Sequence, residues 1–88
     1  MTKYEYAGEM QELCFKISQV CKVLEEEGMQ DFYKATSDGF EKMRKAYSVE
    51  EAAMVISDDQ EKQLESTAAY VKELQKQAAE KLDKEIAI

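Results

Sequence analysis

The stretch YAGEMQELCFKISQVCKVL, residues 6–24, decides the fold. Its apolar residues recur in alternating steps of four and three, which places them along one face of a helix. We therefore predict a helix from Lys3 to Glu27, with Gly28 as the left-handed residue that commonly follows a helix. The seam of this helix consists of Tyr6, Met10, Leu13, Ile17, Val20 and Leu24.

A second periodic pattern extends over residues 30–47. The stretch TSDG, residues 36–39, is typical of a helix break, but the apolar residues on both sides of it keep one helical phase. We therefore predict one helix that contains Gly39 at a cost of about 1 kcal/mol, with a close helix crossing at this glycine. Its stripe consists of Phe32, Tyr33, Thr36, Phe40, Met43 and Tyr47.

The remaining residues predict a short helix and a long one. Ser48 and Glu51 have the spacing of a capping box, which opens a short helix in VEEAAMVI, residues 49–56. SDDQ, residues 57–60, supplies the cap and the acids that begin a final helix, which runs to about Glu85. The stripe of the final helix consists of Leu64, Ala68, Val71, Leu74, Ala78, Leu82 and Ile86.

Together these patterns predict an all-α fold, a small antiparallel helical bundle of three long helices and one short helix. The chain has no proline and only three glycines, which favours helices throughout. Its 88 residues form a single domain, residues 1–88. The helical phase also continues from Val49 to Leu64, so three helices, with the last one continuous from about residue 49, are an open alternative.

The net charge of −7 narrows the choice of partners. Nucleic acids and anionic membranes both need basic side chains, so we expect neither as a direct partner, whereas a protein with a basic surface fits. The longest apolar run, AAMVI at residues 52–56, is too short for a membrane span or for the core of a signal peptide. We expect a cytoplasmic protein, with leaderless export left open.

The chain lacks most of the residues that catalytic and metal-binding sites usually contain. The chain has no histidine, which removes the histidine-activated nucleophiles and the imidazole metal sites. Its two cysteines are too few for a thiolate zinc site, its glycines are scattered, and its adjacent acids splay apart on a helix. We therefore expect no enzyme, no catalytic residue, no metal and no cofactor.

Cys14 and Cys21 lie on the same side of the helix seam. Seven helical residues separate them by about 10.5 Å along the axis, which is too far for a disulfide within the helix. We interpret them as small apolar residues at the edge of the core.

Two groups of residues are candidates for binding a partner. Phe15 lies opposite the seam, on a far face that also carries Tyr4. Glu25, Glu26 and Glu27 fall at the predicted C-terminal end of a helix, where the helix dipole disfavours anions, so they have no structural explanation there. Asp31 is a further acid shortly after them. The predicted partner-binding residues are therefore Tyr4, Phe15, Glu25, Glu26, Glu27 and Asp31.

The leading functional hypothesis is a non-catalytic, small acidic interaction protein. It would act as an adaptor, a chaperone-like subunit or an inhibitor, by surface binding to a protein partner. A second hypothesis is a phage-type inhibitor that covers a basic, nucleic-acid-binding surface of a host protein. A small exported helical-hairpin protein and a structural homo-oligomer are two further hypotheses, and a homodimer is the simplest form of such an oligomer.

Overall fold

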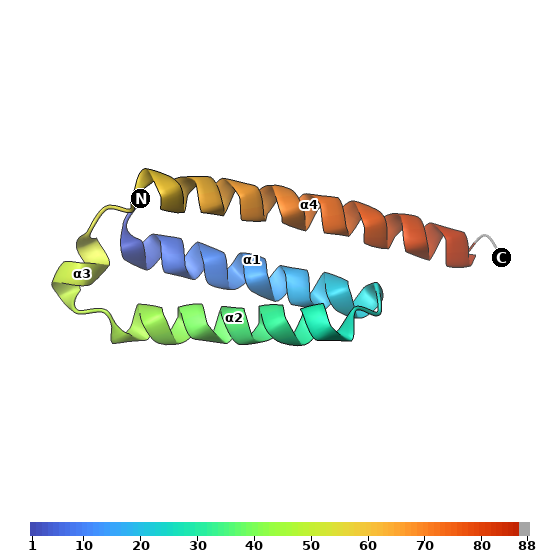
Figure 1. Cartoon of the computed structure of the whole chain (residues 1–88), viewed down its shortest axis with the longest axis horizontal. Helices are drawn as coiled ribbons and strands as arrows, with labels where there is room; N and C mark the ends of the chain where they lie inside the picture. The colour runs from blue at the N-terminus through green and yellow to red at the C-terminus, as the bar shows by residue number, and fades with distance from the viewer. Residues whose placement is uncertain (87–88) are drawn as a thin grey trace.

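A computed structural model describes residues 1–86 of the chain, so residues 87–88 of the predicted domain lie outside the described part. The described residues form four helices in the predicted order (Figure 1). The all-α prediction of three long helices and one short helix is therefore confirmed. The helices are α1 (Lys3–Val23), α2 (Glu27–Ala46), α3 (Val49–Ala53) and α4 (Asp58–Ile86).

The alternative of one continuous helix from about residue 49 is wrong, because α3 and α4 are separate helices. Ser48 caps α3 by accepting a hydrogen bond from the Glu51 amide (3.1 Å). The helix ends at Ala53, and Met54 already has an extended backbone conformation. The extended segment pairs with the start of the chain, where the Lys3 amide donates to the Met54 carbonyl (2.7 Å) and the Ile56 amide donates to the Met1 carbonyl (3.1 Å). Two capping serines, Ser48 and Ser57, thus begin two separate helices.

The three long helices lie side by side, with α1 in the middle (Figure 1). Helices α1 and α2 are antiparallel, whereas α4 runs in the same direction as α1. Within residues 1–86, α1 packs against α2 and α4, but α2 and α4 do not pack against each other along their length. The radius of gyration is 15.2 Å, compared with about 12 Å for a compact chain of this length. The described chain is therefore elongated, with a longest extent of 55 Å.

The core lies along α1. One cluster contains Tyr6, Met10, Cys14 and Ile56, and a second contains Ile17, Cys21, Val71 and Leu74. Cys14 and Cys21 are only 2% and 0% exposed, so the prediction that they lie at the edge of the core is wrong. The reason is that α1 contacts a helix on each of two sides, which widens its buried face beyond the predicted seam. Three seam residues are only half-buried: Leu13, Val20 and Leu24.

The boundary between α1 and α2 differs from the prediction. Helix α1 ends at Val23, and Glu25 rather than Gly28 adopts the left-handed conformation, with φ at 61°. The Glu26 amide donates to the Cys21 carbonyl (2.9 Å), and the Glu25 amide donates to the Lys22 carbonyl (3.2 Å), as in a Schellman motif. Gly28 instead lies within the first turn of α2.

Packing accounts for this early ending of α1. Leu24 packs against the core cluster around Ile17 and Cys21. Lys81 of α4 donates to the Val23 carbonyl (2.8 Å), and its amine lies 3.6 Å from the Glu25 carboxylate. A lysine at this position satisfies a free carbonyl and complements the negative end of the helix dipole.

Helix α2 is continuous through Gly39, as predicted, but no helix crosses there. A Cβ atom at Gly39 would meet nothing within 4 Å. The close contact lies at Gly8 of α1, where a Cβ atom would come within 3.6 Å of the Arg44 guanidinium. The only buried residue of α2 is Ser37, whose hydroxyl donates to the Gln11 carbonyl (2.9 Å).

Replacing Glu25 with glycine is expected to raise the free energy of unfolding by about 0.5–1 kcal/mol, because glycine tolerates the left-handed conformation that a larger residue resists. Loss of the ion pair with Lys81 reduces this gain by only a few tenths of a kcal/mol, roughly, since the Glu25 carboxylate is largely exposed. Urea unfolding followed by circular dichroism measures the change. The control is Glu27→Gly, which places glycine in a helical turn and should lower stability.

Truncation of the core should depend on burial and not on the predicted seam. Ile17→Ala should cost about 3 kcal/mol, because Ile17 is fully buried between α1 and α4. Leu13→Ala should cost about half as much, because Leu13 is half-buried. Equal losses in urea unfolding would contradict the assignment of Ile17 to the centre of the core.

Candidate functional site

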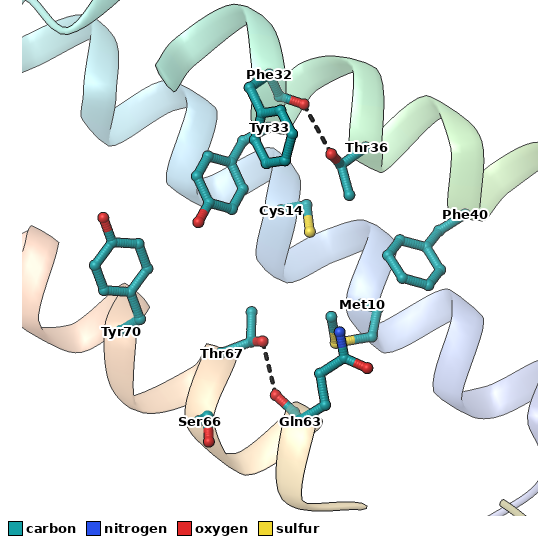
Figure 2. A pocket seen from close by; sticks show the side chains of 10 residues that line it. All are labelled: Met10, Cys14, Phe32, Tyr33, Thr36, Phe40, Gln63, Ser66, Thr67 and Tyr70. Carbon is teal, nitrogen blue, oxygen red and sulfur yellow. Dashed lines mark hydrogen bonds between the residues drawn. The ribbon is translucent and has the colours of Figure 1, made fainter. Parts of the chain in front are cut away.

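A groove runs between α2 and α4, over the middle of α1 (Figure 2). Met10 and Cys14 of α1 form its floor, and its volume is about 340 Å³. Tyr33 and Tyr70 face each other across it, with ring centroids 6.2 Å apart. The rest of the walls consists of Phe32, Thr36 and Phe40 from α2, and Gln63, Ser66 and Thr67 from α4.

Three polar side chains of this groove, Thr36, Gln63 and Thr67, have hydrogen-bond partners within the chain. The Thr36 hydroxyl donates to the Phe32 carbonyl (2.8 Å), and the Thr67 hydroxyl donates to the Gln63 carbonyl (2.7 Å). Below them, the Tyr6 hydroxyl donates to the side-chain oxygen of Gln63 (2.7 Å). None of the side chains described as lining the groove is a carboxylate or a base. The groove therefore suits an apolar ligand surface better than a reacting substrate.

An exposed apolar stripe on α2 continues the groove outward. We call it the α2 stripe, and it consists of Phe32, Thr36, Gly39, Phe40 and Met43. Phe32 is 62% exposed and Met43 is 43% exposed. A second hollow of about 300 Å³ lies along Thr36, Gly39, Phe40 and Met43. Of the predicted stripe of α2, Phe32 and Met43 lie at the surface, whereas Tyr33 and Phe40 are partly buried against the core.

The two cysteines are free and buried. Burial raises the pKa of the Cys14 thiol, and burial, followed by the charge of Glu26, raises the pKa of the Cys21 thiol. Burial also raises the pKa of Tyr33, with a smaller effect of Tyr70 beside it. All three groups are therefore neutral at pH 7. Over residues 1–86, no group of three or more cysteine, aspartate or glutamate side chains is placed to hold a metal ion.

The predicted aromatic candidates lie on the other edge of α1. Tyr4 is half exposed and lies under the Arg44 guanidinium, 5.5 Å from its ring centroid. Phe15 is 49% exposed and lies in a hollow of about 300 Å³ between α1 and α2. Three acids surround this hollow: Glu12, Asp38 and Glu41. Sequence reasoning missed these acids as neighbours of Phe15, because Asp38 and Glu41 come from another helix.

The predicted acidic candidates lie elsewhere. Glu25 directly follows the C-cap residue of α1, as predicted, but Glu26 is the cap residue of α2 and Glu27 lies in its first turn, so their placement at the C-terminal end of a helix is wrong. Anions stabilise a helix N-terminus, which supplies the structural explanation that Glu26 and Glu27 lacked. Asp31 is exposed one turn further along α2. These acids lie near the far end of α1 from Tyr4, a distance of about 30 Å, so the structure does not bring the six candidates into one site.

Comparisons with protein-family models, with curated proteins and with solved structures found no match to this chain. None of the helices described over residues 1–86 is long and apolar enough to cross a membrane.

Both thiols should resist modification until the protein unfolds. Because their pKa values are raised, the neutral thiols stabilise the fold at and below their ordinary pKa, and this contribution is lost as the pH rises through the raised values. A thiol reagent added across a urea titration at pH 8 should label both cysteines with the same midpoint as the loss of helix. Labelling of Cys14 before unfolding would show that the groove floor opens to solvent.

Proposed function

We propose that this chain is a non-catalytic interaction protein that binds a helix of a protein partner along the α2 stripe and the adjoining groove. The observation that carries the proposal is the exposure of Phe32 at the edge of the apolar groove and of Met43 in the adjoining hollow. Contiguous apolar surface of this kind marks a binding site more often than isolated exposed residues do. The function is thus recognition by contact, as expected of an adaptor, a chaperone-like subunit or an inhibitor.

A helix is the partner element that suits this shape. The groove lies between two helices, and Phe32 is exposed on its α2 wall with Met43 further along the stripe, so an amphipathic helix can place its apolar face on these side chains. Such a helix would complete a second packed layer over α1, which small helical domains normally achieve within one chain. Aromatic anchors such as Phe32 and Tyr33 are frequent at the centre of interfaces.

A second candidate function uses the hollow around Phe15. The exposed ring of Phe15 and the three acids around it suit a basic protein surface. This arrangement supports the hypothesis of an acidic inhibitor that covers a basic, nucleic-acid-binding surface. The net charge of −7 would add to the attraction at low salt.

Single aspartate substitutions on each face test both candidates. Immobilised protein is used to retain proteins from a lysate of the source organism. Phe32→Asp and Met43→Asp should each abolish retention, because they place a charge in the apolar face. Leu82→Asp is the matched control, since Leu82 is similarly exposed on α4 outside the groove and should retain the partner.

Phe15→Asp separates the two functions. Loss of retention with Phe15→Asp alone, together with release by salt, would favour the basic partner at the Phe15 hollow. Retention that survives Phe32→Asp and Met43→Asp would contradict the proposed binding face. Circular dichroism of each variant checks that the helices remain.

A further inference from the structure

We infer that the helix that covers the α2 stripe is α2 of a second copy of this chain, paired antiparallel about a twofold axis near Ser37 and Asp38. This inference rests on the proposed function, because it names the partner of the same face. Three observations carry it: the surplus surface of the single chain, the distribution of charge along α2, and the register of its exposed residues, which positions the axis.

The single chain exposes more surface than its mass requires. Its accessible surface is 6188 Å², whereas a compact monomer of 10.1 kDa exposes about 5,300 Å². The surplus of about 900 Å² matches the roughly 800 Å² that each partner buries in a stable interface. The surplus belongs to the whole elongated chain, which is 55 Å long, and its size equals that of one interface of this class.

The charge of α2 is divided between its two halves. On the two sides of the axis, residues 27–37 carry two acids and one lysine, a net charge of −1, and residues 38–47 carry three basic residues and two acids, a net charge of +1. An antiparallel pair places each acidic half against the basic half of the other copy, whereas a parallel pair would oppose like charges. Because residues 27–47 sum to zero, the whole net charge of −7 lies outside the proposed contact. Two copies can therefore meet here with little repulsion.

The register of the exposed side chains agrees with this pairing. Phe32 and Met43 lie equally far from the axis along α2, so each would contact the other residue in the second copy. Thr36 and Gly39 also lie equally far from it, and the open space above Gly39 allows a close approach of the two helices. Asp31 would then lie near Lys42 of the second copy, and the described residues offer Lys42 no ion pair within its own chain.

Sedimentation equilibrium of the full chain tests the inference, over concentrations from about 1 μM to 1 mM. We expect a mass of twice 10.1 kDa at the upper end. Phe32→Asp and Met43→Asp should each raise the dimer dissociation constant at least about tenfold. Leu82→Asp, the matched control on α4, should change it less than about twofold.

Charge exchange and cross-linking test the orientation. Asp31→Lys and Lys42→Asp should each weaken the dimer, and the double variant should restore it, because the pair is then reversed across the axis. A mixture of Phe32→Cys and Met43→Cys chains should form the mixed disulfide in preference to either symmetric one. Preferential formation of the symmetric disulfides would overturn the antiparallel pairing.

The outcomes separate this inference from the proposed function. A monomer at all concentrations overturns the inference, while loss of a captured partner with Phe32→Asp would still support the proposed function with a different protein as partner. A dimer that is unaffected by Phe32→Asp and Met43→Asp forms through another surface and also overturns the inference. A monomer that captures nothing through this face contradicts both.

Discussion

The pairing between the first residues of the chain and residues 54–56 is the constraint on which the rest of the structure depends. The hydrogen bonds Lys3 to Met54 and Ile56 to Met1, with the bridge between Thr2 and Val55, hold the start of α4 beside the start of α1. Helix α4 must then run in the same direction as α1 (Figure 1). Helix α3 forms the connection from α2, and both α2 and α4 pack against α1, with Tyr33 and Tyr70 close to each other across the groove between them.

This arrangement makes the single helix α1 the centre of the core. It must pack on two sides at once, so its buried positions include small residues that admit close neighbours, namely Ala7, Cys14, Ser18 and Cys21. Helix α2 buries only Ser37 completely, and its residues Tyr33 and Phe40 are partly buried against the core at the edge of the groove. Part of the apolar face of α2 is therefore exposed because the arrangement of the helices does not cover it.

The sequence predicted the helices well, because their signals are local. Periodicity and capping serines act within a few residues of the positions that they determine, and Ser48 begins a helix as expected. The end of α1 was not predictable in this way, because the packing of Leu24 and the contact of Lys81 with Val23 come from residues distant in the sequence. With these contacts, the left-handed residue is Glu25 and not the predicted Gly28.

The candidate site was less predictable than the fold. An apolar stripe has the same spacing whether it faces the core of its own chain or a partner, so Phe32 and Met43 could not be separated from core residues by periodicity. The cysteines were misplaced for a related reason, since the width of a buried face depends on how many helices pack against it. The acids around Phe15 come together only through the packing of α1 on α2, where Ser37 binds the Gln11 carbonyl.

Three residues of the α2 stripe, Gly39, Phe32 and Met43, lower the stability of the single chain without a compensating contact. Gly39 costs about 1 kcal/mol relative to alanine within a helix, yet no side chain or neighbouring helix among residues 1–86 occupies the space above it. Phe32 and Met43 expose apolar area that burial would convert into stability at about 25 cal/mol per Å². Such departures from local preference are expected where a residue serves a contact and not the fold. That three of them share one face of α2 is the strongest reason to regard the isolated chain as an incomplete packing unit.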